Sequence, residues 1–188
     1  EEPAQGHVTI GHTRWATHGP PCQRNAHPHT DVTGRVVVVQ NGIVENFSAL
    51  RSQLIEAGHT FKSDTDTEVL VNLIEEIKKE EKVKLGKAVQ IALNQVVGAY
   101  AIALFDRNEP DEIVVARLGS PLAIGIGEDE LFVASDATPF IEFTNNAVYL
   151  KDEEMAIIRR GREVRIRNIH SDSLVDPYIQ ELQLNLEQ

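Results

Sequence analysis

A nine-residue stretch, GHTRWATHG at residues 11–19, combines residue types that seldom share one strand or helix. It contains two histidines, an arginine and the only tryptophan of the chain. The guanidinium of Arg14 could grip a carboxylate through two parallel hydrogen bonds, although a surface arginine would give the same pattern. We interpret the stretch as a candidate binding loop, with Arg14 as the group that would hold an anion.

The pair Asn41-Gly42 follows a β-branched run, RVVVVQ, that is typical of a buried strand. Asn-Gly is a common turn between two strands, and we expect the strand to stop there. A second interpretation is an oxyanion hole, in which a side-chain amide and a backbone N–H point into one cavity. The helical pattern that follows within a few residues disfavours a hairpin.

Asp66 lies in the first turn of a predicted helix, in the motif SDTDTEV. An acidic residue there offsets the positive end of the helix dipole, which is a purely structural role. The alternative is that its carboxylate receives the ammonium group of a ligand. The sequence alone leaves both interpretations open.

Five of the seven histidines lie among the first 29 residues, which raises the question of a metal site. Their spacing does not match a zinc pattern, and a single cysteine provides no cysteine pair, so we predict no metal and no cofactor. That cysteine, Cys22, could be a nucleophile with His27 or His29 as its base. We disfavour this role because Cys22 lies in a loop with no helix N-terminus marked nearby.

The composition excludes several classes of protein. The net charge of −11 disfavours binding to nucleic acid or to an anionic membrane surface. The apolar runs are too short to cross a bilayer, and one cysteine among 188 residues suits a reducing, cytoplasmic location. Hydrophobic residues make up 41% of the chain, enough for a substantial core.

Periodicity predicts an α+β domain with largely antiparallel sheets. We expect strands over residues 8–12 and 35–40, then helices over 47–57, 65–77 and 85–96. Asn46 and Gly58 would cap the first helix, and Thr65 and Glu68 would form a capping box on the second. Seven strands follow between residues 98 and 167, with a short helix at 137–143, and the tail is a helix or a linker.

Four motifs, GHTRWATHG, NAHPH, VVVVQNGIVENF and SDTDTEV, together resemble the glutaminase domain of glutamine amidotransferases of the N-terminal-nucleophile type. The resemblance is strongest to the members that deliver ammonia to fructose 6-phosphate, and it extends to about Arg167. It implies a four-layer sandwich of two antiparallel sheets flanked by helices. We expect residues 1–170 to form a partial glutaminase domain and 171–188 a C-terminal tail or linker helix.

The resemblance also implies roles for individual residues. Arg14 would bind the α-carboxylate of glutamine, and Asp66 its α-ammonium group. The side chain of Asn41 and the backbone N–H of Gly42 would form the oxyanion hole. Trp15 would belong to a mobile loop that closes on glutamine, and three further residues would line or brace the pocket: Thr17, His18 and His27.

The sequence departs from this family in one respect. The resemblance implies an N-terminal cysteine nucleophile far ahead of Arg14, and no cysteine precedes Arg14 here. The chain begins EEPAQG and its only methionine is Met155, so we expect an N-terminally truncated domain that lacks the first strands and is inactive alone. Its partners would be glutamine and a sugar-phosphate isomerase domain, in a homo-oligomer.

Two alternatives remain open at this stage. One is the glutaminase domain of an amidophosphoribosyltransferase, which we disfavour because its loop carries a tyrosine-serine pairing after the arginine. The other is a non-catalytic module that binds glutamine.

Overall fold

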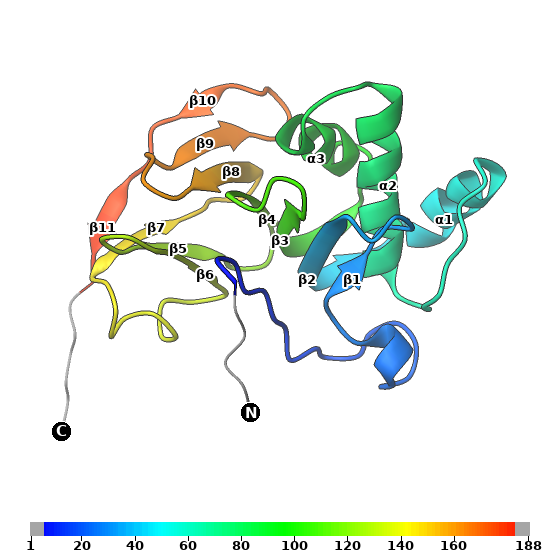
Figure 1. Cartoon of the computed structure of the whole chain (residues 1–188), viewed down its shortest axis with the longest axis horizontal. Coiled ribbons are helices and arrows are strands. Elements are labelled where there is room, and N and C mark those ends of the chain that lie inside the picture. The colour runs from blue at the N-terminus through cyan, green and yellow to red at the C-terminus, as the bar shows by residue number, and fades with distance from the viewer. Residues whose placement is uncertain (1–5, 183–188) are drawn as a thin grey trace.

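The computed structural model describes residues 6–182 and shows an α+β architecture (Figure 1). The described helices are η1 (Gln23–Asn25), α1 (Phe47–Glu56), α2 (Asp66–Glu80) and α3 (Leu85–Leu93). The first strands are β1 (His29–Thr30), β2 (Val36–Val44), β3 (Gly98–Asp106), β4 (Glu112–Leu118), β5 (Ala123–Ile126) and β6 (Leu131–Ala134). The later strands are β7 (Asn146–Tyr149), β8 (Glu154–Arg159), β9 (Arg165–Asn168), β10 (Leu174–Val175) and β11 (Ile179–Glu181).

The strands form two antiparallel sheets. The larger sheet has the order β1-β2-β3-β4-β8-β9-β10, and the smaller one has the order β11-β7-β5-β6. The α+β class and the two antiparallel sheets predicted from the sequence are therefore confirmed.

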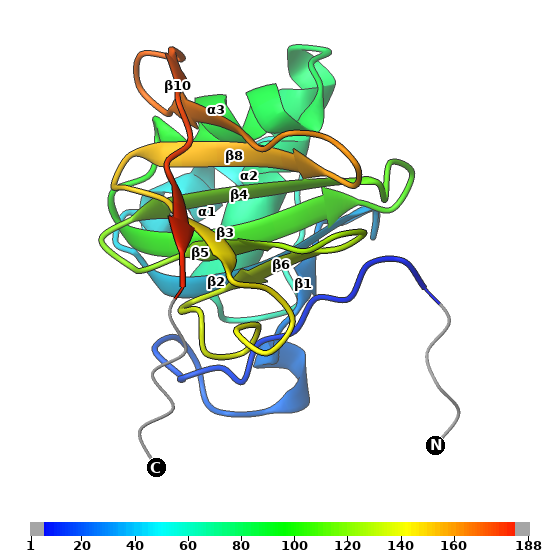
Figure 2. The ribbon, with the colours of Figure 1, turned by 90° about the vertical axis from the view of Figure 1, so that its left-hand side faces the viewer.

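The larger sheet lies between the helices and the smaller sheet (Figures 1 and 2). Alternate residues of its strands face a core shared with α2 and α3, among them Val38, Ile102 and Val114. The intervening residues face the smaller sheet, where Val115 and Ala156 pack near Ile124. Because side chains of a strand alternate between its two faces, one sheet can serve both cores.

The outer face of the smaller sheet is covered by turns. Residues 138–143, which lie within the segment expected to be a short helix, form successive turns instead. Phe140 in these turns is buried against Phe132, with ring centroids 5.9 Å apart. The described residues thus build three of the four layers that the resemblance implies.

Helix α2 begins as the sequence predicts, with one change. Thr65 caps it, since its Oγ1 accepts a hydrogen bond from the Glu68 N–H at 3.3 Å. The Glu68 carboxylate does not return to the Thr65 N–H as in a capping box; it accepts instead from the N–H groups of Lys62 and Ser63. This pairing ties the preceding loop to the helix.

Helix α1 differs from the prediction at its start. Asn46 occupies the N-cap position, but its side chain bonds the backbone of Gln95 and Val97 and not the helix. Gly58 follows the helix end with φ of 95°, as predicted for a C-terminal glycine. Ile55 of this helix is 49% exposed.

Strand β2 does not stop at Asn41-Gly42, contrary to the prediction. It continues to Val44 and pairs with β3 throughout, so that Gly42 lies opposite Tyr100 and Val44 opposite Gly98. Gly42 has φ of 130°, and a Cβ there would lie 2.1 Å from the Ala99 carbonyl oxygen. The glycine therefore permits a close backbone approach rather than a turn.

Both ends of the chain also differ from expectation. Residues 8–12 form no strand in the structure. In the tail, β10 pairs with β9 and β11 pairs with β7, so this part of residues 171–188 is strand and not helix. The remainder of the predicted tail, residues 183–188, lies outside the described range. Among the described helices, none is long and apolar enough to cross a membrane.

Candidate active site

A pocket of about 240 Å³ lies where the 11–19 segment meets β2 and the start of α2. All eight residues singled out from the sequence line it: Arg14, Trp15, Thr17, His18, His27, Asn41, Gly42 and Asp66. They come from four separate segments of the chain. Its volume suits a ligand about the size of an amino acid, since pockets for drug-sized ligands measure roughly 300–1,000 Å³.

Asp66 is the buried charge of this pocket, with 4% of its surface exposed. One carboxylate oxygen, Oδ2, accepts hydrogen bonds from the Val44 N–H at 2.8 Å and from Gln40 Nε2 at 3.3 Å. The other oxygen, Oδ1, lies 3.6 Å from His18 Nδ1. The protein thus fixes the carboxylate through Oδ2 and leaves Oδ1 for a donor in the pocket.

The edge of β2 beyond Val38 carries no paired strand among the described residues, and this edge borders the pocket. The Gln40 N–H points from it to His27 Nδ1 at 3.4 Å. Since backbone N–H groups alternate between the two edges of a strand, the Gly42 N–H points to the same side. Asn41 is exposed beside it.

Three histidine rings form a row at the pocket, and two of them, His12 and His27, belong to its lining. The ring of His27 lies 4.6 Å from that of His12 and 4.9 Å from that of His29, measured between centroids. His29 Nε2 lies 3.2 Å from Oγ1 of Thr65, the cap of α2. The row therefore links the 11–19 segment to the helix that carries Asp66.

This environment keeps the three rings uncharged. Burial, together with the neighbouring His29, His12 and Arg14, lowers the pKa of His27 to about 3. Burial also lowers the pKa of His12 and of His29. Uncharged rings can pack closely without repulsion, and His27 Nδ1 is then free to accept from Gln40.

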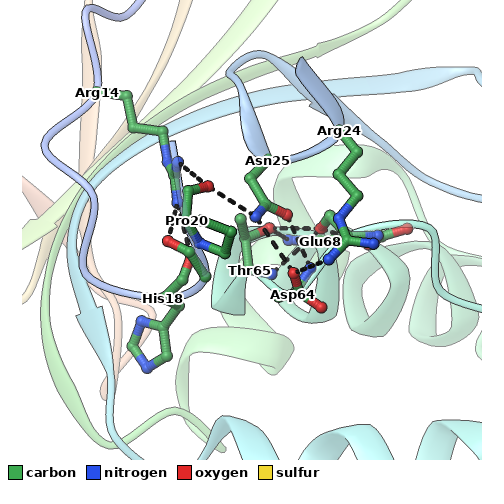
Figure 3. A network of polar contacts seen from close by, with 10 residues as sticks. Arg14, His18, Pro20, Arg24, Asn25, Asp64, Thr65 and Glu68 are labelled. Atoms are coloured by element: carbon green, nitrogen blue, oxygen red, sulfur yellow. Dashed lines mark hydrogen bonds and ion pairs between the residues drawn. The ribbon is translucent and has the colours of Figure 1, made fainter. Parts of the chain in front are cut away.

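Arg14 braces the loop of residues 14–20 from within (Figure 3). Its Nη2 donates to the His18 carbonyl at 2.6 Å, and longer contacts of 3.5 and 3.4 Å reach the carbonyls of Gly19 and Pro20. Arg14 itself has φ of 57°, a left-handed conformation that is uncommon for a residue with a side chain. Trp15, by contrast, is 89% exposed.

Five lining residues were not predicted from the sequence: His12, Gln40, Ile43, Thr65 and Thr67. Gln40 is the most informative of them, because it is a polar residue at the end of a buried apolar run. Its side chain is 3% exposed and bonds Asp66. The polar residue at the end of the apolar run could have indicated this role from the sequence, since a buried amide needs a polar partner.

Cys22 does not line the pocket, and it is exposed. Within residues 6–182, no three His, Cys, Asp or Glu side chains gather as a metal-ligand set.

The comparison with known families agrees with these motifs and this geometry. Residues 3–161 match the family described as the glutamine amidotransferase domain. This chain belongs to that family. The match covers the pocket, strands β1 to β8 and the three α-helices, so the family assignment includes every segment that supplies a lining residue.

Curated relatives in this family are named glutamine–fructose-6-phosphate aminotransferase (isomerizing). The protein from Bacteroides thetaiotaomicron is 51% identical over 183 residues, which is 97% of this chain and 30% of the relative. The one from Chlorobaculum tepidum is 55% identical over 154 residues, 81% of this chain and 25% of the relative. The chain thus spans less than a third of the length of these relatives.

Solved structures extend the comparison to the fold. A glutamine phosphoribosylpyrophosphate amidotransferase from B. subtilis has a TM-score of 0.66 and 28% identity, over 84% of this chain and 34% of that one. A structure described as the allosteric regulatory enzyme of purine biosynthesis has a TM-score of 0.69, with the same identity and coverage. The glutamine amidotransferase fold predicted from the motifs is confirmed.

Proposed function

We propose that this chain forms the glutamine-binding part of a glutaminase unit that supplies ammonia to fructose 6-phosphate. The observation that carries the proposal is the pocket itself. It places a buried carboxylate, that of Asp66, whose Oδ1 accepts no hydrogen bond within residues 6–182, in the same small cavity as Arg14 and the Gly42 edge of β2. Glutamine has an ammonium, a carboxylate and a carboxamide, which these three features would recognise.

Asp66 would bind the α-ammonium group through Oδ1. A charge-assisted hydrogen bond to a buried carboxylate is stronger than a neutral one, because the low-dielectric surroundings screen it less. Oδ2 is held by Val44 and Gln40, so the carboxylate would need no rearrangement when the ligand arrives. His18, 3.6 Å from Oδ1, would border the same position.

Arg14 would bind the α-carboxylate. Two of its three contacts with the loop are long, at 3.4 and 3.5 Å, and a carboxylate can replace such contacts with shorter, charge-assisted bonds. Thr17 and His18 would line the carboxylate end, and the exposed Trp15 would close over the ligand.

Asn41 and Gly42 would act at the carboxamide. When a thiolate attacks the carboxamide carbon, negative charge develops on the oxygen. The Gly42 N–H and the Asn41 side chain would stabilise that charge, a contribution of about 2.7–4 kcal/mol for one such donor. Because the charge appears in the transition state, this pair would affect rate more than binding.

The attack itself requires a cysteine thiol, and the one cysteine of the sequence is Cys22. Cys22 is exposed and outside the pocket lining. We therefore expect this chain to bind glutamine without hydrolysing it. This outcome also describes a non-catalytic glutamine-binding module, and full activity in a longer protein containing this chain would separate the two functions.

Fructose 6-phosphate is favoured as the acceptor by the relatives. Proteins named for it are 44–55% identical to this chain, whereas the phosphoribosylpyrophosphate amidotransferase structure is 28% identical. The loop also carries Trp-Ala-Thr-His after Arg14 and not the tyrosine-serine pairing expected of an amidophosphoribosyltransferase. The isomerase partner, homo-oligomeric assembly and cytoplasmic location remain predictions that accompany this proposal.

The proposal is tested by titrating the chain with L-glutamine and following its tryptophan fluorescence and heat of binding. Trp15 is the only tryptophan and lines the pocket, so its emission should change on saturation. D-glutamine reverses the positions of ammonium and carboxylate and should bind weakly. Trp15→Phe should abolish the fluorescence signal, and the heat of binding that remains should keep the preference for L-glutamine. Equal binding of both enantiomers, or of neither, would refute the proposal.

A further inference from the structure

Asn25, the first residue of the NAHPH motif, is fully buried, with no exposed surface. It closes the short helix η1. It does not line the pocket, and no role follows for it from the proposed binding of glutamine. A buried amide has three or four hydrogen-bonding positions to satisfy, so its partners show what it holds in place.

The side chain of Asn25 joins two separate segments (Figure 3). Its Nδ2 donates to the Pro20 carbonyl at 3.0 Å and to Asp64 Oδ2 at 3.3 Å. Its Oδ1 accepts from the Asp64 N–H at 3.0 Å. Pro20 ends the 14–20 loop, and Asp64 lies two residues before Asp66. One amide therefore connects the loop that carries Arg14 to the start of α2.

Gly19 shows how closely the two segments approach each other. A Cβ on Gly19 would lie 2.5 Å from Asn25 Nδ2 and 2.8 Å from Asp64 Cβ, closer than real Cβ contacts. Gly19 also has φ of 72°. The loop can reach Asn25 and Asp64 only because this position has no side chain.

Arg14 holds the same turn of the loop from the opposite side. Its guanidinium contacts the carbonyls of His18, Gly19 and Pro20, and Asn25 Nδ2 donates to the last of these. The Pro20 carbonyl is thus shared between the two side chains. Asn25 thus fixes, through Pro20, the loop whose His18 carbonyl holds Arg14 at 2.6 Å, and it fixes that loop relative to α2.

We propose that Asn25 is a positioning residue that sets the separation between the two ends of the amino-acid site. The inference rests on the proposed function, in which Arg14 binds the carboxylate and Asp66 the ammonium. An α-amino acid keeps these two groups at a fixed distance. A pocket that binds both groups must hold its two binding segments at a matching distance, and Asn25 bridges these segments through three hydrogen bonds.

An asparagine suits this position because it donates and accepts at once. An aspartate would still accept from the Asp64 N–H but would lose both donated bonds. It would also place a second carboxylate beside Asp64 Oδ2, which now receives Asn25 Nδ2 and Arg24 Nη2. Two carboxylates in contact repel each other at neutral pH. Asn25→Asp is therefore a nearly isosteric change that should separate the two segments.

The experiment compares four forms of the chain by hydrogen exchange without ligand and by glutamine titration. The forms are the unchanged chain, Asn25→Asp, Gly19→Ala and Arg24→Ala. Asn25→Asp and Gly19→Ala should speed exchange in residues 14–20 and weaken glutamine binding by about tenfold, the loss expected for one or two hydrogen bonds. Arg24→Ala removes the exposed Arg24–Asp64 pair, with side chains 60% and 46% exposed, and should change neither.

A rescue distinguishes positioning from a general loss of structure. Adding Asp64→Asn to Asn25→Asp restores a donor opposite an acceptor, so exchange and affinity should return part of the way. Unchanged exchange and affinity in Asn25→Asp and Gly19→Ala would overturn the proposal, as would a defect that the second substitution leaves untouched. If Asn25→Asp does not fold, Gly19→Ala decides the question from the loop side.

Failure of the proposed function has a different signature. The unchanged chain would then not bind glutamine at all. Faster exchange of residues 14–20 in Asn25→Asp would still show that Asn25 holds the loop, whereas unchanged exchange would overturn the positioning role as well.

Discussion

The pocket is bordered on one side by β2 with the start of α2 and on the other by the 14–20 loop, and the two sides differ in burial. Gln40, Thr65 and Asp66 on the first side are 3–4% exposed. On the second side, Trp15 is 89% exposed and Arg14 is held by carbonyls of its own loop. The first side is fixed by regular structure, whereas the second is fixed by a few side-chain bonds.

This difference in burial predicts which substitutions will alter stability and which will alter only the affinity for glutamine. Groups on the β2 and α2 side serve both the fold and the ligand, so changes there should alter stability and affinity together. Groups on the loop side have few contacts with the core, so changes there should alter affinity alone. Four substitutions test this comparison, from the largest expected effect to the smallest.

Asp66→Asn should have the largest effect. It keeps the shape of the side chain but removes the charge that would meet the ligand ammonium, and hydrogen bonds to charged groups contribute about 1.5–3 kcal/mol, roughly ten- to hundredfold in affinity. The helix also loses an acidic residue in its first turn, worth about 0.3–1 kcal/mol. Calorimetric titration and urea unfolding measure the two losses. Asp129→Asn, at an exposed position, is the control.

Arg14→Lys should weaken glutamine binding by about tenfold, because an ammonium cannot make the two-point contact of a guanidinium. Unfolding free energy should change by less than about 0.5 kcal/mol, as for other substitutions away from the core. A stability loss as large as that of Asp66→Asn would contradict the distinction between the two sides.

The histidine row predicts a loss of stability in acid. The pKa of His27 is about 3 in the folded chain and near 6.5 when unfolded. Below pH 6.5 His27 binds a proton in the unfolded state but not in the folded state. The free energy of unfolding should therefore fall as pH drops from 6.5 toward 3. The slope per histidine is below the limit of about 1.4 kcal/mol per pH unit, because the rings are partly exposed.

Urea unfolding at pH 7, 6, 5 and 4 measures this slope. His27→Gln removes the titrating group and should flatten the dependence, although His12 and His29 shift in the same direction and would preserve part of it. His170→Gln, at an exposed position, should leave the slope unchanged. An equal slope in all three chains would show that His27 does not titrate as the structure indicates.

Cys22→Ala should have the smallest effect. Cys22 is exposed and contributes nothing to the pocket lining, so glutamine affinity and unfolding free energy should both match the unchanged chain. Purified chain should release no ammonia from glutamine with or without this cysteine. Ammonia release that Cys22→Ala abolishes would assign it the nucleophilic role disfavoured from the sequence.

Much of the fold was predictable because its pattern is local. The stripe of α2 (Val69, Leu70, Leu73, Ile74 and Ile77) is buried as its period predicts. The prediction that the strand ends at Asn41-Gly42 was wrong because Asn-Gly usually forms a turn, whereas here both residues pair with β3. The missing side chain of Gly42 instead allows the backbone of Ala99 to approach closely. The same holds for Asn46, whose partners Gln95 and Val97 lie about fifty residues away.

The motifs predicted which residues line the pocket, but they did not predict the hydrogen bonds that hold those residues in place. The eight lining residues predicted from the resemblance do meet in one cavity. Gln40 and Asn25 were missed because their roles depend on partners 26 and 39 residues away, Asp66 and Asp64. No local period reveals a contact of that kind.

The Asp66 carboxylate has a consequence for how this site responds to selection. Binding residues are commonly costly to the fold, so selection for stability alone tends to erode them. Here the oxygen that accepts from the Val44 N–H belongs to the same carboxylate that offers Oδ1 to the pocket. A laboratory evolution experiment that screens only for thermal resistance should therefore retain Asp66 while Arg14 and Trp15 drift, and the surviving variants would keep half of a binding site without ever having been tested for one.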